Sequence, residues 1–232
     1  KIKGVRLESG ELIEAENVIV TTGGKSVPKT GSTGDGHKFA KASGHTVTKL
    51  FPTEVPILSD EPFIKDETLK GLSLKDVALS VLKKNGKPRI THQMDMIFTH
   101  FGVSGPAALR CSQFVIKEQE SQKREDIMMM IDFYPEKSNG ELIEELDRLV
   151  KDNKDKSIKN ILKPLGQQRL IDFMVHHLGI DETINGHNVS NEDKRKIIEF
   201  LKSFKFTVSG TQSIEKSFVT GGGVNLKEIT PK

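Results

Sequence analysis

The chain of 232 residues carries 35 Lys and Arg against 32 Asp and Glu, which gives a net charge of +3 with neutral histidines. A hydrophobic content of 35% and a charged content of 29% exclude a disordered polar tail. No window holds about 18 consecutive apolar residues, so the sequence predicts no transmembrane helix and no membrane partner. Its one cysteine, Cys111, cannot form an internal disulfide, and we expect a cytoplasmic location. The chain begins without Met inside a strand-like run, so we expect a segment of a longer protein.

The first 50 residues combine strand signals with glycine-rich loops. Two alternating runs, 5–8 and 11–14, flank Ser9-Gly10 and predict a hairpin. Residues 17–21 are β-branched and apolar without alternation, which predicts a strand buried on both faces. A short helix is expected over 35–43.

The next segment is rich in strand signals up to residue 137. Strand-sized runs occupy 55–58, 74–82, 89–91, 96–98 and 127–133. Asn85-Gly86 is a strong hairpin signal, because both residues tolerate the positive φ of a tight turn. Ser104-Gly105-Pro106 predicts the start of a helix over 105–117, with Ser104 as its cap.

A helical pattern begins at residue 138. Ser138 with Glu141, and Ser190 with Asp193, predict two helix starts with capping boxes. We expect 138–203 to be almost entirely helical and to have a core separate from that of the β-rich segment. Strand signals return at 204–208 and at 219–224.

Three short motifs carry candidate chemistry. Thr22-Gly23-Gly24 and Gly34-Asp35 place glycines where backbone can approach a bulky planar or phosphorylated ligand. Taken alone, the spacing favours the ordinary alternatives, a tight turn for the first motif and a capped helix start for the second. Thr99, His100 and Ser104 are candidates for holding a carboxylate or an oxyanion near a helix start, the alternative being a capped helix with a satisfied histidine. The histidines lack the spacing of metal ligands, so we expect no metal.

Taken in order, these motifs resemble one family. The runs 18–28, 31–36, 98–106 and 219–229 are similar to those of the bacterial NAD(P)/FAD-dependent oxidoreductases, which include aminoacetone oxidase and bile-acid dehydro-reductases. The resemblance covers essentially the whole chain. It implies an FAD domain built from two separated stretches, with a substrate domain inserted between them.

The resemblance also implies a fold and a set of site residues. The expected fold is α+β: a β-barrel-like substrate domain carries a small all-helical subdomain, and remnant strands of a split FAD-binding α/β domain lie at both ends. The expected parts are 1–50 (FAD-binding remnant), 51–137 (β-rich insert), 138–203 (helical subdomain), 204–218 (return strand of the β-rich part) and 219–232 (return to the FAD-binding part). By the family's pattern, the residues at or near FAD are Thr22, Gly23, Gly24, Gly34 and Asp35. Thr99, His100 and Ser104 are the substrate-side candidates.

One departure from the family concerns the cofactor. The strand–G-x-G-x-x-G–helix unit that holds the FAD pyrophosphate is not in this sequence. We therefore expect an FAD-dependent parent enzyme acting on a small-molecule substrate, and an inactive segment that binds no FAD by itself.

The alternative hypothesis is a non-enzymatic module. In it, residues 138–203, with the basic cluster Lys194-Arg195-Lys196, bind nucleic acid or a protein partner. The small net charge, the absence of Trp and the single Tyr make nucleic acid the less expected partner.

Overall fold

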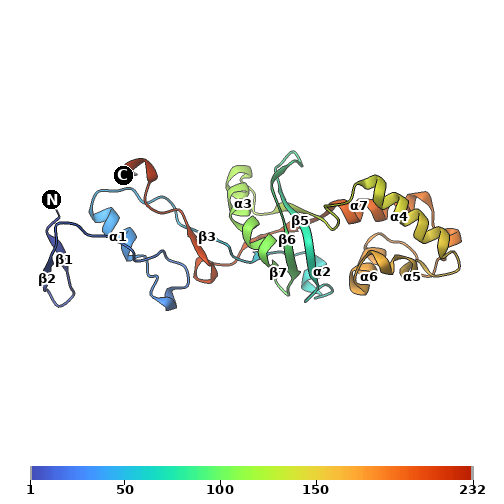
Figure 1. Cartoon of the computed structure of the whole chain (residues 1–232), viewed down its shortest axis with the longest axis horizontal. Helices are drawn as coiled ribbons and strands as arrows, with labels where there is room; N and C mark the ends of the chain where they lie inside the picture. The colour runs from blue at the N-terminus through green and yellow to red at the C-terminus, as the bar shows by residue number, and fades with distance from the viewer. Residues whose placement is uncertain (1, 231–232) are drawn as a thin grey trace.

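The computed structural model describes residues 2–230 as an elongated molecule with three parts in line (Figure 1). Both termini lie at one end, a barrel-like sheet forms the middle, and a helical block forms the other end. This part of the chain contains seven α-helices, and all its strand pairs are antiparallel. The α+β class and the barrel-like middle are as predicted, while the exact domain boundaries stay a prediction.

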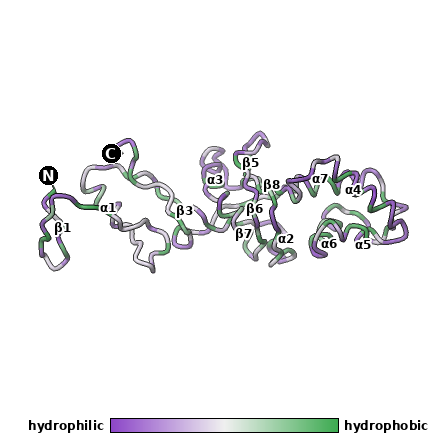
Figure 2. Tube along the Cα trace, viewed as in Figure 1, coloured by the Kyte–Doolittle hydropathy of each residue, from purple (hydrophilic) through white to green (hydrophobic). Residues whose placement is uncertain are grey.

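The first 50 residues form small elements with no apolar core. β1 (Gly4–Arg6) pairs with β2 (Leu12–Glu14) as the predicted hairpin, and α1 (Asp35–Ala42) is the predicted short helix. The predicted buried strand over 17–21 is wrong: these residues form no strand, and Ile19 is 87% exposed. A strand buried on both faces needs neighbours on both sides, and the described residues supply none. Figure 2 shows hydrophobic stretches in this end of the molecule, and most of the exposed large apolar side chains lie here or in the returning segment.

A two-stranded ribbon joins this end to the barrel. β3 (Phe51–Thr53) pairs antiparallel with β11 (Val219–Gly221), and Val47 forms a further bridge with Val224. Gly221 is needed there, because a Cβ at that position would lie 2.5 Å from the Phe51 ring. The segments that leave and re-enter the terminal part are therefore adjacent in space, as the insertion hypothesis requires.

The barrel-like sheet has seven strands in the order β10-β4-β7-β6-β5-β8-β9. Their bounds are β4 (Ile57–Leu58), β5 (Ser73–Leu82), β6 (Pro88–Phe98), β7 (Gly102–Ser104), β8 (Ile127–Asp132), β9 (Phe204–Val208) and β10 (Gly210–Thr211). The predicted turn at Asn85-Gly86 joins β5 and β6. The barrel is not closed by a backbone ladder; instead the Ser59 hydroxyl donates to the Thr207 carbonyl at 2.6 Å across the gap, and the Thr207 amide donates to Glu61 at 2.7 Å.

Helix α3 (Pro106–Gln122) packs against this sheet, and the short α2 (Pro62–Lys65) covers one end of it. The cap of α3 differs from the prediction: Gly105 is the N-cap, no side chain caps the helix, and Ser104 pairs with Ile97 in the sheet. Because the Gly105 Cβ position lies 2.9 Å from the Met96 Cα atom, only glycine lets the chain turn there from strand into helix.

The helical block contains α4 (Asn139–Asp152), α5 (Ile158–Leu162), α6 (Gln168–His177) and α7 (Asn191–Ser203). Both predicted capping boxes are present, at the starts of α4 and α7. One isolated bridge, between Ser157 and Asn185, interrupts the otherwise helical pattern.

The core of the helical block is continuous with the core of the barrel. Phe63 of α2 lies 5.2 Å from Phe173 of α6, and Phe204 of β9 lies 4.7 Å from Phe200 of α7, measured between ring centroids. The prediction of separate cores is wrong, because one cluster of buried side chains runs through both parts. The change of sequence period at residue 138 marks a change of secondary structure and not the edge of a core.

Candidate functional site

The loop at Thr22–Gly24 is held by the returning strand. The Thr220 hydroxyl accepts hydrogen bonds from the backbone amides of Lys25 at 2.8 Å and Ser26 at 3.0 Å. A Cβ on Gly24 would lie 2.5 Å from the same hydroxyl oxygen, so glycine is required for this contact. Gly24 thus serves the packing of two chain segments, whereas Gly23, with a φ of 70°, presents its backbone to the surface.

A small hydroxyl cluster fixes this junction. The Ser26 hydroxyl lies 2.8 Å from the hydroxyls of both Ser217 and Thr220. Sequence reasoning missed Ser26 and Ser217, because they lie 191 positions apart and nothing local marks either residue. The expected insertion of one domain into another, whose two ends must be neighbours, was the only signal that pointed to this region.

The start of α1 lies beside the same loop. A Cβ on Gly36 would lie 2.5 Å from the Thr22 hydroxyl oxygen, so helix and loop are in direct contact. Gly34, with a φ of 84°, is the N-cap residue of α1. The Asp35 carboxylate accepts hydrogen bonds from Lys38 at 2.8 Å and Thr33 at 2.7 Å, and these bonds hold the pKa of Asp35 below its usual value. The structure thus brings the five predicted FAD-side residues together around one loop and one helix start; their role in binding stays a prediction.

The substrate-side candidates lie elsewhere, on the barrel. Thr99 closes the turn between β6 and β7, donating to the Gly102 carbonyl through its hydroxyl at 3.1 Å. His100 is exposed at this turn, with its ring against Phe101 at 4.9 Å. Across residues 2–230, no hydrogen bond or ion pair links these residues to the loop at Thr22–Gly24. The geometry at Thr99 and His100 is that of a tight turn, Ser104 is paired in the sheet, and their part in substrate binding stays a prediction.

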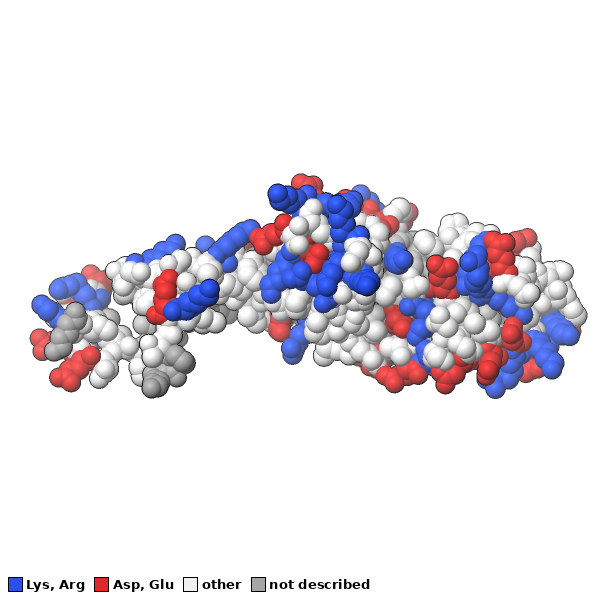
Figure 3. All heavy atoms as spheres, turned by 90° about the horizontal axis from the view of Figure 1, so that it is seen from above, with Lys and Arg blue, Asp and Glu red and all other residues white. Residues whose placement is uncertain are grey.

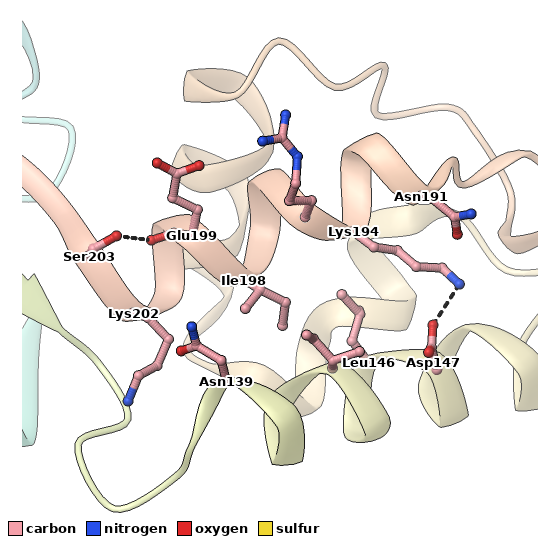
Figure 4. Close-up of a pocket in the computed structure, with 11 residues that line it drawn as sticks. Asn139, Leu146, Asp147, Asn191, Lys194, Ile198, Glu199, Lys202 and Ser203 are labelled. Carbon is pink, nitrogen blue, oxygen red and sulfur yellow. Dashed lines mark hydrogen bonds and ion pairs between the residues drawn. The ribbon is translucent and has the colours of Figure 1, made fainter.

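A groove between α4 and α7 is lined by Lys194 and Arg195, two residues of the basic cluster of the helical block (Figure 4). It has a volume of about 360 Å³, and Ile143, Leu146 and Ile198 are its apolar lining residues. Its lysines are neutralised: Lys194 pairs with Asp147 at 2.7 Å, and Lys202 pairs with Asp132 at 2.7 Å. The groove therefore offers few free positive charges to an anionic partner.

Residues 51–219 match the family model described as "HI0933-like protein barrel and H2TH domain". The chain belongs to this HI0933-like family. The match begins at the first residue of β3 and ends at the first residue of β11, so its two ends lie next to each other on the ribbon. The sheet and the helices α4 to α7 are the two parts that this description fits.

Three relatives of this HI0933-like chain are informative. A ribosomal RNA dihydrouridine synthase of Haemophilus influenzae is 30% identical over 94% of the chain and 50% of its own length. The protein of the same name from Escherichia coli is 25% identical over 97% of the chain and 52% of its length. A 3-dehydro-bile acid delta(4,6)-reductase of Clostridium scindens is 22% identical over 96% of the chain and 53% of its length. The chain thus spans about half the length of the curated relatives it matches.

No described helix is both long and apolar enough to cross a lipid bilayer. No group of three or more His, Cys, Asp or Glu side chains in the described chain is placed to hold a metal ion.

Proposed function

We propose that this chain is the substrate-side middle part of a flavin-dependent reductase that converts uridine to dihydrouridine in ribosomal RNA. The observation that carries the proposal is the relative named for this reaction, which is 30% identical over 94% of the chain. A second relative of the same name supports it. The proposal replaces the small-molecule substrate that we expected from the sequence.

The two reactions for which these relatives are named belong to one chemical class. Forming dihydrouridine adds a hydride and a proton across a carbon–carbon double bond that is conjugated to a carbonyl. A bile-acid delta(4,6)-reductase is likewise named as a reductase of carbon–carbon double bonds. FAD, when bound and reduced by a nicotinamide cofactor, supplies the hydride in such reactions. The proposed redox step is therefore common to both names, and only the substrate differs.

The residues of the terminal part fit one side of an FAD site. Gly23 and Gly34 both have left-handed backbone, but only Gly23 is exposed; Gly34 is buried, and α1 begins directly after it. The backbone at Gly23 can contact a cofactor without a side chain in the way, while Thr220 and Ser26 hold the loop in place. The exposed apolar side chains nearby, such as Ile19 and Phe218, are expected to pack against the remainder of the whole protein.

A direct test uses the full-length protein. It should purify with a visible flavin absorbance band and, with NADH or NADPH, should introduce dihydrouridine into ribosomal RNA from cells lacking the gene, as measured by nucleoside mass spectrometry. A flavoprotein that leaves this RNA unchanged but is reoxidised by unsaturated 3-oxo steroids would refute the RNA substrate and favour the small-molecule one. That second candidate is supported by the bile-acid reductase relative.

A further inference from the structure

One end of the barrel carries a concentration of unpaired positive charge. Lys83, Lys84 and Lys87 surround the turn between β5 and β6, and Lys123 and Arg124 follow the end of α3. We call these five residues the hairpin face. All five are exposed, and none of them forms an ion pair with any residue of the described chain. In Figure 3, which looks down on this end, Lys and Arg gather over the middle of the molecule.

The turn and the helix end form one surface. The Gln122 amide of α3 donates to the Leu82 carbonyl of β5 at 3.3 Å, and Arg89 of β6 forms an ion pair with Glu118 of α3. Residues from both elements line one shallow hollow of about 350 Å³, among them Lys83, Lys84 and Arg89.

The buried carboxylate beneath this surface is already satisfied. Burial opposes the ionisation of Glu118, but hydrogen bonds from Gln122 and Arg89, with the nearby charge of Lys83, hold its pKa below the usual value. Its ion pair is formed with Arg89, and no residue of the hairpin face forms an ion pair with it. Glu125 and Asp126 follow Arg124 in the sequence, and Asp126 lines a different hollow with Asp60 and Glu61.

The hairpin face is held rigidly despite its own repulsion. The Lys83 amide donates to the Lys87 carbonyl at 2.9 Å, which fixes two like charges across the turn. The Asn85 side chain accepts from the Lys87 amide at 3.1 Å and stabilises the turn. Like charges placed opposite each other destabilise a strand pair, so their grouping here is a cost to folding.

The basic cluster of the helical block, Lys194-Arg195-Lys196, is built differently. In the helical block, Lys194 and Lys196 each pair with an acid at 2.8 Å or less. That block, residues 138–203, holds eleven Lys and Arg against twelve Asp and Glu. The helical block is therefore close to neutral overall, so it has no net positive charge to offer a polyanion.

We propose that the hairpin face binds the phosphate backbone of the RNA substrate. That the bound polyanion is RNA rests on the proposed function. That it binds at this end of the barrel rests on the unpaired lysines. A lysine without an acidic partner can bind a phosphate without first breaking an ion pair within the protein. Each such contact also releases counterions from the RNA into solution, which favours binding. The contacts carry no sequence information; they fix where the RNA lies on the barrel.

The test compares two triple variants of the full-length protein. K83Q/K84Q/K87Q removes three charges of the hairpin face. The control K65Q/K70Q/K75Q removes three charges from the same barrel, where each lysine is paired with Asp60, Glu67 or Asp95. Binding of a fluorescent ribosomal RNA fragment is followed by anisotropy over a range of salt concentrations. K83R/K84R/K87R, which keeps the charges, should bind as the unmodified protein does.

The magnitude follows from counterion release. At about 0.1 M salt each phosphate contact is worth roughly five- to eight-fold in affinity, from slopes of about 0.7 to 0.9 per contact. If at least two lysines contact phosphates, K83Q/K84Q/K87Q should bind about 25-fold more weakly or worse, with a salt slope lower by about 1.4 to 1.8 or more. Unchanged thermal unfolding of the variant would show that folding is intact.

Each outcome decides one claim. A larger loss of RNA affinity in K83Q/K84Q/K87Q than in the control supports the hairpin face. Equal losses in the two variants, with RNA reduction by the unmodified protein intact, overturn the hairpin face and leave the proposed function standing. Absence of both RNA binding and RNA reduction in the unmodified protein overturns both.

Discussion

The contact between Phe63 and Phe173 gives a sharp test of how the barrel and the helical block hold together. Phe63 belongs to α2 beside the sheet, Phe173 belongs to α6, and their ring centroids lie 5.2 Å apart at an interplanar angle of 58°. Both side chains are buried, at 8% and 7% exposure. If the core is continuous, replacing one ring should weaken the contribution of the other.

The expected magnitudes come from the contact itself. Phe63→Leu and Phe173→Leu should each lower the free energy of unfolding by about 1–2 kcal/mol, through lost packing. The loss of unfolding free energy in the double variant should be smaller than the sum of the two single losses by about 0.5–1.5 kcal/mol. This difference is the usual contribution of an aromatic pair in addition to the burial of its surface. In a chain of this size, 1 kcal/mol corresponds to about 2–4 °C in the unfolding midpoint.

The assay is denaturant unfolding followed by circular dichroism and by labelling of the Cys111 thiol. Circular dichroism reports all the helices, whereas Cys111 lies in α3 of the barrel. The control cycle pairs Phe63→Leu with Val150→Ala, since Val150 is near the end of α4 that points away from the barrel in Figure 1. A coupling near zero for Phe63 and Phe173, or separate transitions in the two probes, would refute a shared core.

Three further predictions concern single groups and the isolated chain. Burial raises the pKa of Tyr134, the only tyrosine of a chain without Trp, to about 12, so its absorbance should titrate near 12 in the folded chain and about 10 in the unfolded chain. Because the folded pKa is the higher one, this group's contribution to stability should be complete below pH 10 and should fall as the pH rises toward 12. Burial raises the pKa of Cys111 to about 12, so a thiol reagent should leave it unmodified at pH 8 until denaturant is added; rapid modification of the native chain would contradict the buried position. The isolated chain should show no saturable quenching when micromolar FAD is titrated and flavin fluorescence is followed, because its sequence lacks the glycine-rich unit for the pyrophosphate.

The features that the sequence predicted well are those set by a few neighbouring residues. Asn85-Gly86 produced the expected hairpin, and the boxes at Ser138 and Ser190 produced the expected helix starts. In each case the hydrogen bonds that fix the structure join residues within a few positions of each other. The strand at Phe204–Val208 was also predicted, from the alternation of its bulky apolar residues, although its partner strand β8 lies far away along the chain.

The features that escaped prediction depend on partners far along the chain. Residues 17–21 have the composition of a central strand, but a strand exists only where other strands pair with it. The shared core depends on contacts such as that of Phe63 with Phe173, which local periodicity does not reveal. The hairpin face joins two short basic runs, and only the fold shows that they are neighbours without acidic partners.

The ribbon of β3 and β11 has a consequence for how such a protein can be altered. Thr53 and Val219 are paired neighbours, so everything between them is attached through two adjacent points. A cassette attached in this way can be deleted and replaced by a short turn, or transplanted into another protein that offers two adjacent strand ends. Surfaces on the cassette can then diverge freely, while the backbone of the host keeps its own geometry.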